Sequence, residues 1–345
     1  MSRNALITGI TGQDGSYLAE FLLEKDYRVF GLVRRSSAGP NLRNLSRIEK
    51  DIELLQGDMT DSDSLKRAVK DAQPHEIYNL AAQSFVPMSW ASPTYTMNVN
   101  AGGFVYLLEA VRDSADPRAV KIYQASTSEM YGNTGYRDYG PLRETGGGVM
   151  LNENSMMRPR SPYGVSKLAA HRMVQVYRES FDMFICAGIL FNHESPRRGD
   201  MFVTRKITQN VVRIVNGDQD YLHLGNLQAR RDWGYARDYV DAMWRMLQQN
   251  EPEDFVIGTG RTYSVEDFAV FAFEHAQELL NKKLDRPWDT YIKVDPRFYR
   301  PAEIFTLKAD YSKARDKLKW RPKTKLDDLV KMMVAHDIIE EGLVT

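Results

Sequence analysis

The chain has 345 residues, of which 43% are hydrophobic and 27% charged. This is the composition of an ordinary globular protein, long enough for one large or two modest domains. Lysine plus arginine and aspartate plus glutamate number 46 each, so no overall field favours nucleic acid or an acidic membrane as a partner. The single cysteine, Cys186, excludes an intramolecular disulfide. With neither a signal peptide nor a long apolar run, we expect a cytoplasmic protein.

The first apolar run, residues 5–8, predicts a buried strand that leads into the glycine-rich segment 9–15 and then a helix. A strand, a glycine turn and a helix in this order are typical of dinucleotide-binding proteins. The glycines permit a tight turn and close approach of the backbone to a pyrophosphate, which then faces the helix N-terminus.

The second predicted strand, residues 28–33, ends in Arg34-Arg35-Ser36-Ser37. NAD-specific folds usually carry an acidic residue here, roughly 20 residues after the glycines. Guanidinium groups and hydroxyls suit a 2′-phosphate instead, so these residues predict NADP. A solvated basic turn is the alternative on these residues alone.

Further strands are predicted at residues 52–59, 76–80, 121–125 and 183–191, with one helix over 95–111. Alternating strands and helices predict an α/β fold, a Rossmann-type doubly wound parallel sheet. From residue 200 the elements become short and mixed. We therefore expect an NADP-binding domain at 1–190. A smaller, mixed α/β C-terminal substrate domain is expected at 191–345, with some segments returning to the first.

Tyr163 and Lys167 are four residues apart and so lie on one face of a predicted helix. An ammonium held near a phenol lowers its pKa from about 10 and makes it a base at neutral pH. Ser126, Thr127 and Glu129 follow a strand, where open α/β sheets hold their ligands. The alternative for the Tyr/Lys spacing alone is an ordinary amphipathic helix.

Residues 132–160 predict a loop, and the triple glycine 146–148 indicates a surface loop, since it follows no strand. Basic residues recur near 205, 230 and 300, which suggests that the second domain supplies cations to an anionic ligand; a solvated charged surface is the alternative. The six histidines show no metal-ligand spacing, so no metal is expected.

The glycine turn and the Tyr163/Lys167 pair resemble the extended short-chain dehydrogenase/reductase superfamily. Within it, several segments taken in order are similar to the GDP-mannose 4,6-dehydratases, and the resemblance covers nearly the whole chain. The segments are residues 80–84, 125–132, 160–164, 188–199, 224–227 and 231–234.

The resemblance implies a role for each matching residue. Thr127, Glu129, Tyr163 and Lys167 would be catalytic. The cofactor NADP would contact Gly9, Ile10, Thr11, Gly12, Gln13, Asp14, Gly15, Arg34, Arg35, Ser36, Ser37, Asp58, Met59, Leu80, Ala81, Ala82, Gln83, Ser84, Tyr95, Lys167, His193 and Arg198. The GDP-sugar would contact Ser84, Ser126, Asn192, Lys206, Arg231, Arg300 and Glu303. Members of the family assemble as homodimers or homotetramers.

The activity so implied is dehydration of GDP-D-mannose to GDP-4-keto-6-deoxy-D-mannose by internal hydride transfer. The stretch 132–160 is longer, and 281–294 shorter, than in some relatives. These departures leave the same chemistry on a GDP-heptose or another GDP-hexose open. Two different kinds of function also stay open: a GDP-sugar epimerase or reductase on the same fold, and an NADP-binding protein without activity.

Overall fold

The computed structural model describes residues 2–35, 37, 39–114, 116–133 and 149–343. Two predictions, the cofactor contact of Ser36 and the surface loop at 146–148, lie outside these residues. Within them, no helix is long and apolar enough to cross a membrane, and no three histidine, cysteine or acidic side chains are grouped to hold a metal ion.

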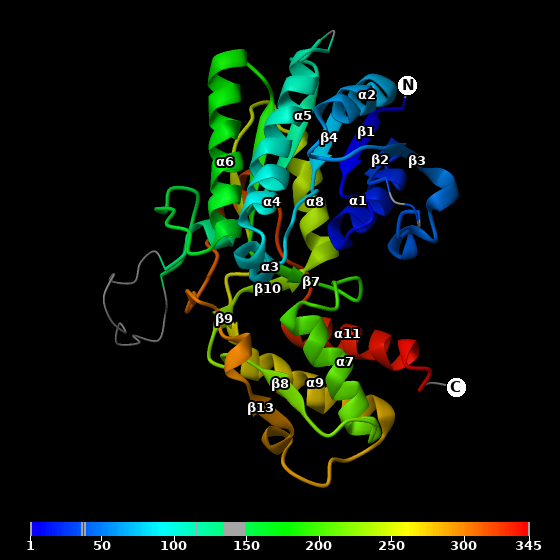
Figure 1. Ribbon diagram of the computed structural model, residues 1–345, viewed down its shortest axis with the longest axis vertical. Coiled ribbons are helices and arrows are strands. Elements are labelled where there is room, and N and C mark those ends of the chain that lie inside the picture. The colour runs from blue at the N-terminus through cyan, green and yellow to red at the C-terminus, as the bar shows by residue number, and fades with distance from the viewer. Residues whose placement is uncertain (1, 36, 38, 115, 134–148, 344–345) are drawn as a thin grey trace.

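A seven-stranded sheet forms the larger part of the molecule, which we call the sheet body (Figure 1). Its order is β11-β6-β5-β4-β1-β2-β3, and every neighbouring pair is parallel. The predicted Rossmann-type sheet is confirmed. The strands are β1 Asn4–Thr8, β2 Arg28–Val33, β3 Glu53–Gln56, β4 Glu76–Asn79, β5 Lys121–Thr127, β6 Ile185–Leu190 and β11 Phe255–Ile257.

Helices pack on both faces of this sheet and bury two apolar clusters. Helices α1 and α8 cover one face, and α2, α5 and α6 cover the other. The α-helices of the sheet body are α1 Gln13–Leu23, α2 Ser62–Ala72, α3 Val86–Ala91, α4 Pro93–Met97, α5 Gly103–Arg112, α6 Pro162–Phe181, α8 Ala236–Leu247 and α10 Ser312–Lys317. Short 3₁₀ turns lie at Arg43–Leu45, Glu49–Asp51 and Ser128–Met130.

The single helix predicted over 95–111 is wrong in one respect, because a π-helical turn, Asn98–Gly102, separates α4 from α5. Within this wider turn the Asn100 amide faces the Gln83 peptide. It accepts from Gln83 N at 2.8 Å and donates to Gln83 O at 3.1 Å. These two hydrogen bonds from the π-helical turn hold the segment that follows β4 in place.

The remaining elements form a small body below the sheet body (Figure 1). Its helices are α7 Val203–Asn216, α9 Val265–Leu280 and α11 Leu326–Glu340, with 3₁₀ turns at Trp288–Tyr291 and Pro296–Phe298. Three strand pairs complete it: β7 Asn192–Glu194 with β10 Trp233–Tyr235, β8 Leu222–Leu224 with β13 Ile292–Val294, and β9 Arg230–Arg231 with β12 Tyr263–Ser264. Between these elements the chain returns to the sheet body as α8 and β11.

The segment 149–160, at the end of the predicted loop, covers the outer edge of the sheet. Glu153 Oε1 accepts a hydrogen bond from Val256 N of edge strand β11 at 2.7 Å. Leu151 forms a parallel bridge with Ala309. A side chain therefore satisfies a backbone donor that an edge strand would otherwise leave open to another chain.

One buried ion pair fixes the small body internally. Arg205 of α7 pairs with Asp337 of α11, and the two side chains are 2% and 1% exposed. Burial raises the pKa of Asp337 to about 6, although the Arg205 guanidinium opposes the shift. Charges this deep are tolerated because each has the other.

Replacement of Arg205 tests this dependence. Arg205→Met leaves the Asp337 carboxylate buried without its cation, so we expect the free energy of unfolding in urea to fall by about 3–5 kcal/mol at pH 7. Arg213→Met, which breaks the more exposed pair with Glu341, is the control and should cost less than about 1 kcal/mol. Equal losses of unfolding free energy in the two variants would show that the buried pair stabilises the protein no more than the exposed pair does.

Candidate active site

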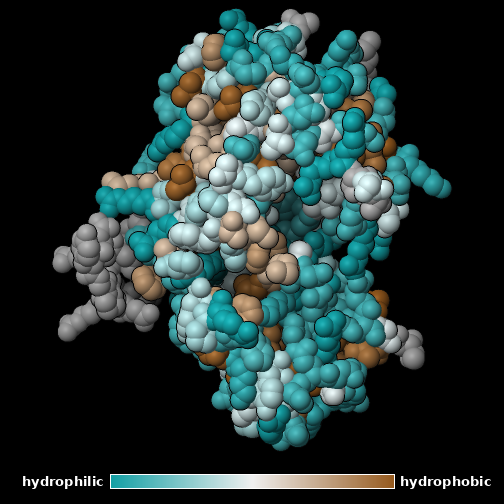
Figure 2. All heavy atoms as spheres, in the orientation of Figure 1, coloured by the Kyte–Doolittle hydropathy of each residue, from teal (hydrophilic) through white to brown (hydrophobic). Residues whose placement is uncertain are grey.

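A cavity of about 1080 Å³ separates the sheet body from the small body. Its upper wall is formed by the carboxyl ends of β1, β4 and β5, and its lower wall by β7, α7 and residues 298–303. The molecular face in Figure 2 is hollowed between the two bodies. The cavity therefore lies where the strand order reverses, between β1 and β4, the usual ligand position in open α/β sheets.

The glycine turn after β1 forms one end of the cavity. Gly9 has φ +71°, and a Cβ there would lie 2.8 Å from Ala81 N. A Cβ on Gly15 would lie 2.4 Å from Gly9 O. Only glycine fits both positions, so backbone N–H groups at the α1 N-terminus are open to an anionic ligand.

His193 joins the small body to this turn. Its Nε2 is 2.7 Å from Asp14 Oδ2, and its Nδ1 donates to Phe191 O at 2.8 Å. Burial alone would lower the pKa of His193, but the Asp14 carboxylate raises it overall. Burial likewise opposes ionisation of Asp14, yet His193 leaves the Asp14 pKa lowered. Both pKa shifts favour the charged forms of the two side chains, which form an ion pair at the rim of the glycine turn.

Tyr163 and Lys167 lie on one face of α6, as their spacing predicts, and both line the cavity. The predicted effect on the phenol is wrong for the protein alone. Burial raises the pKa of Tyr163 to about 12, with Thr127 opposing it through a hydrogen bond. Lys167 Nζ donates instead to Ala125 O at 2.9 Å, and burial lowers the pKa of Lys167 to about 8. Desolvation outweighs the expected attraction between ammonium and phenolate.

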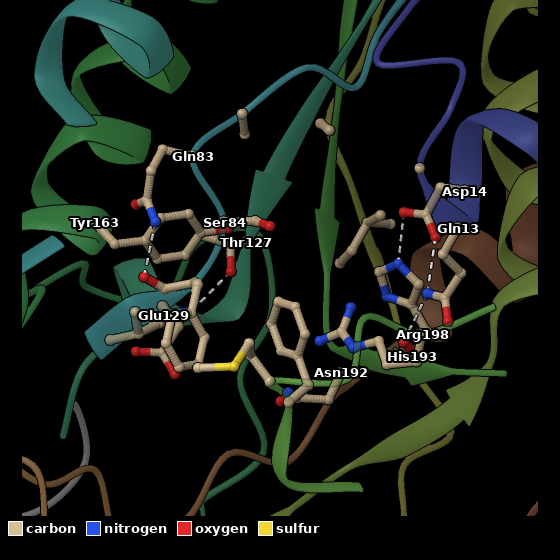
Figure 3. Close-up of a pocket in the computed structure, with 18 of the residues that line it drawn as sticks. Gln13, Asp14, Gln83, Ser84, Thr127, Glu129, Tyr163, Asn192, His193 and Arg198 are labelled. Atoms are coloured by element: carbon tan, nitrogen blue, oxygen red, sulfur yellow. Dashed lines mark hydrogen bonds and ion pairs between the residues drawn. The ribbon is translucent and has the colours of Figure 1, made fainter. Parts of the chain in front are cut away.

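Thr127 and Glu129 lie beside Tyr163 (Figure 3). Thr127 Oγ1 accepts from Glu129 N at 3.3 Å, which starts the 3₁₀ turn Ser128–Met130. Glu129 Oε1 is 3.1 Å from Arg300 Nη1. No described group donates a hydrogen bond to the buried Oε2. Glu129 therefore lines the cavity with one paired and one unpaired carboxylate oxygen.

The small body lines the other wall with cationic groups. Lys206 Nζ lies 3.5 Å from the centroid of the Phe298 ring, and burial lowers the Lys206 pKa. Arg231 Nη2 is 3.3 Å from Glu303 Oε1. Arg198 Nε is 3.0 Å from Glu194 Oε2. The predicted basic sites near 205, 230 and 300 therefore meet in one cavity.

The basic turn after β2 divides between cavity and surface. Arg34 lines the cavity, and its Nη1 donates to Tyr95 OH at 3.4 Å. Arg35 turns away and donates from Nε to Gln56 Oε1 at 3.2 Å. One of the two predicted guanidinium groups is thus available to a ligand in the cavity.

The family model for GDP-mannose 4,6 dehydratase matches residues 6–333. The chain belongs to this family. It is 48% identical over 344 residues to GDP-mannose 4,6 dehydratase 1 of Arabidopsis thaliana, which covers 97% of this chain and 89% of that protein. It is 46% identical over 350 residues to the Homo sapiens GDP-mannose 4,6 dehydratase, covering 97% and 91%.

Among solved structures, UDP-glucose 4-epimerase of Thermus thermophilus in complex with NAD is similar. The TM-score is 0.79 at 25% identity, and the match covers 99% of each chain. Structural neighbours of this dehydratase family member hold nicotinamide dinucleotides, and the glycine cradle here suits such a cofactor.

Most of the predicted site residues line the cavity. They are Gly9, Thr11, Gly12, Gln13, Asp14, Gly15, Arg34, Asp58, Met59, Leu80, Ala81, Ala82, Gln83, Ser84, Tyr95, Ser126, Thr127, Glu129, Tyr163, Lys167, Asn192, His193, Arg198, Lys206, Arg231, Arg300 and Glu303.

Three other predicted cofactor contacts, Ile10, Arg35 and Ser37, lie outside the cavity lining. Ile10 is fully buried in the core cluster beneath α1, because an apolar side chain in the glycine turn points inward. The prediction missed Phe202 and Phe298, whose rings lie against Arg198 and Lys206 in the cavity wall. An aromatic residue close to each predicted basic site was the available signal.

The close approach of Gly9 to Ala81 predicts the effect of a single methyl group. Gly9→Ala should weaken nicotinamide dinucleotide binding by at least about tenfold, since a Cβ forces the turn away from β4. Gly217→Ala is the matched control: Gly217 has φ +94°, but its Cβ would meet nothing within 4 Å. Fluorescence titration of the two variants separates steric clash from backbone strain. Equal weakening of dinucleotide binding in the two variants would contradict the role of the glycine turn in holding the cofactor.

Proposed function

We propose that this chain converts GDP-D-mannose to GDP-4-keto-6-deoxy-D-mannose and water, with NADP as an internal redox carrier. The observation that carries the proposal is the convergence of Thr127, Glu129, Tyr163 and Lys167 beside the glycine cradle in one cavity. An epimerase or reductase needs the Tyr/Lys pair but no carboxylate acting at carbon 5, so Glu129 favours the dehydratase.

The residues of the cavity fit a nicotinamide dinucleotide. The glycine turn would hold the pyrophosphate, and Asp14, Lys167 and His193, which line the same cavity, would also contact the cofactor. When bound, the cofactor would supply the reversible hydride transfer that oxidation at carbon 4 and reduction at carbon 6 of the sugar require. Arg34, which faces the cavity where an NAD enzyme would carry an acid, supports NADP over NAD.

Tyr163 begins the reaction by taking the proton of the sugar 4-hydroxyl. With a pKa of about 12, the Tyr163 phenol keeps its proton in the protein alone. Positive charge from Lys167 and from the oxidised cofactor would lower the pKa of Tyr163 once substrate is bound. Thr127 would hydrogen-bond the oxygen at carbon 4, a contribution worth roughly 3 kcal/mol for one well-placed donor.

Glu129 completes the dehydration. The ketone at carbon 4 makes the proton on carbon 5 acidic, and the unpartnered Oε2 of Glu129 removes it. The 6-hydroxyl then leaves as water with one of the two released protons. After reduction at carbon 6, the other proton returns to carbon 5, so the cofactor ends in its starting state.

The second body and the assembly are also part of the proposal. Residues 191–345 would mainly hold the GDP-sugar through Asn192, Lys206, Arg231, Arg300 and Glu303, and residues 1–190 the cofactor. We further propose a cytoplasmic homodimer or homotetramer. Exposed apolar side chains on α6, among them Val165 and Val176, support an assembled state.

Incubation of GDP-mannose with the protein and NADP in deuterated water tests the reaction. Mass spectrometry should show loss of one water, one deuterium retained in the product and no net NADPH. Glu129→Gln should reduce the rate by roughly 10²–10⁴-fold, because it removes the proposed base for the proton on carbon 5. Full activity of that variant would sink the assignment of the base. Reaction with a GDP-heptose or another GDP-hexose instead would keep the mechanism and change the substrate.

Cofactor preference is tested by the two neighbouring arginines. Arg34→Ala should weaken NADP binding by roughly 10–100-fold and leave NAD nearly unchanged, since a charge-assisted contact to the 2′-phosphate is lost. Arg35→Ala, whose guanidinium lies on Gln56, should have a much smaller effect. Calorimetric titration with both cofactors measures this, and equal losses for NADP and NAD in Arg34→Ala would contradict NADP selection.

A further inference from the structure

The end of the cavity beside Glu129 holds two guanidinium groups and two carboxylates. Arg300 Nη1 is 3.1 Å from Glu129 Oε1, and Arg231 Nη2 is 3.3 Å from Glu303 Oε1. The four side chains interact as one group, since Arg300, Glu129 and Glu303 all influence the pKa of Arg231, which burial lowers overall. Two cations and two anions cancel, so an entering diphosphate meets cations that already have partners.

The two ion pairs differ in how many further hydrogen bonds hold them in place. Arg231 also donates from Nη1 to the backbone oxygens of Arg230 and Ile304, both at 2.9 Å. Glu303 Oε1 accepts from Ile304 N at 3.0 Å. The Arg231 side chain is only 7% exposed. The Arg231–Glu303 pair is therefore tied to the backbone on both sides.

Arg300 is held by much less. Within the described part of the chain, Glu129 is the one group that the Arg300 guanidinium contacts by a hydrogen bond or ion pair. Its side chain is 29% exposed, and it stands on a segment outside any helix or strand. A partly exposed single contact of this kind is weak, whereas a guanidinium and a phosphate form paired, charge-assisted bonds. Arg300 is the cation that can change partner.

We propose that the diphosphate of the GDP-sugar displaces Glu129 from Arg300, so that substrate binding itself releases the carboxylate for proton removal at carbon 5. This rests on the proposed function, since it takes Glu129 as the base and a GDP-sugar as the ligand. Arg300 is then a positioning residue with two successive partners. Until substrate arrives, the Glu129 carboxylate remains paired with the Arg300 guanidinium.

Binding of GDP, which carries the diphosphate but cannot react, tests the exchange in the protein saturated with NADP. Calorimetry on four proteins is needed: the wild type, Arg300→Gln, Glu129→Gln and the double variant. Arg300→Gln should weaken GDP by roughly tenfold, and Glu129→Gln should tighten it by roughly threefold or more, because the diphosphate no longer competes for Arg300. In the Arg300→Gln background, Glu129→Gln should change nothing.

Two further variants keep the result interpretable. Arg297 lies in the same segment as Arg300, its side chain is 83% exposed, and it pairs with Asp295. Arg297→Gln should therefore leave GDP affinity unchanged. Arg300→Lys keeps the charge, so in that background Glu129→Gln should again tighten GDP. This rescue is not expected if Arg300 only supports the local fold.

The proposal is overturned if Glu129→Gln tightens GDP equally with and without Arg300, which would mean simple repulsion between carboxylate and diphosphate. It is also overturned if Glu129→Gln leaves GDP affinity unchanged in the wild-type background. Failure of the proposed function is a separate result: the wild type would bind GDP with the expected coupling yet release no water from GDP-mannose.

Discussion

The reversal of strand order between β1 and β4 is the constraint on which the site depends. The connections from these two strands leave on opposite faces of the sheet, so their carboxyl ends separate and a cavity opens between them. At one end of this cavity Gly9 packs against Ala81, and the approach is too tight for any side chain at position 9. The glycine turn therefore packs directly against the segment that follows β4 at one end of the cavity.

Buried charges then connect the two bodies across that cavity. His193 of β7 pairs with Asp14 at the start of α1, and Arg300 pairs with Glu129 after β5. Each contact joins a segment of the sheet body to one that comes much later in the chain. The small body therefore supplies charge to both ends of the cavity, at the glycine turn and beside Glu129.

The sequence predicted the parts of this site that depend on local geometry. Glycine spacing reports backbone conformation directly, and four residues between Tyr163 and Lys167 define one helix face. It did not predict quantities that depend on the whole fold. The pKa of Tyr163 is set by burial under groups distant in the chain, and the partner of Glu129 is 171 residues away. Side-chain direction within a turn was also hidden, which is why Ile10 and Arg35 were placed in the site.

In the proposed reaction, one nicotinamide carries a hydride from carbon 4 to carbon 6 of the same sugar. GDP-mannose deuterated at carbon 4, incubated with the protein and NADP in ordinary water, tests this transfer most directly. We expect the deuterium to reappear at carbon 6 of the product, seen by NMR, with none left in NADPH. Release of the label to solvent, or its accumulation in free NADPH, would contradict an internal redox cycle.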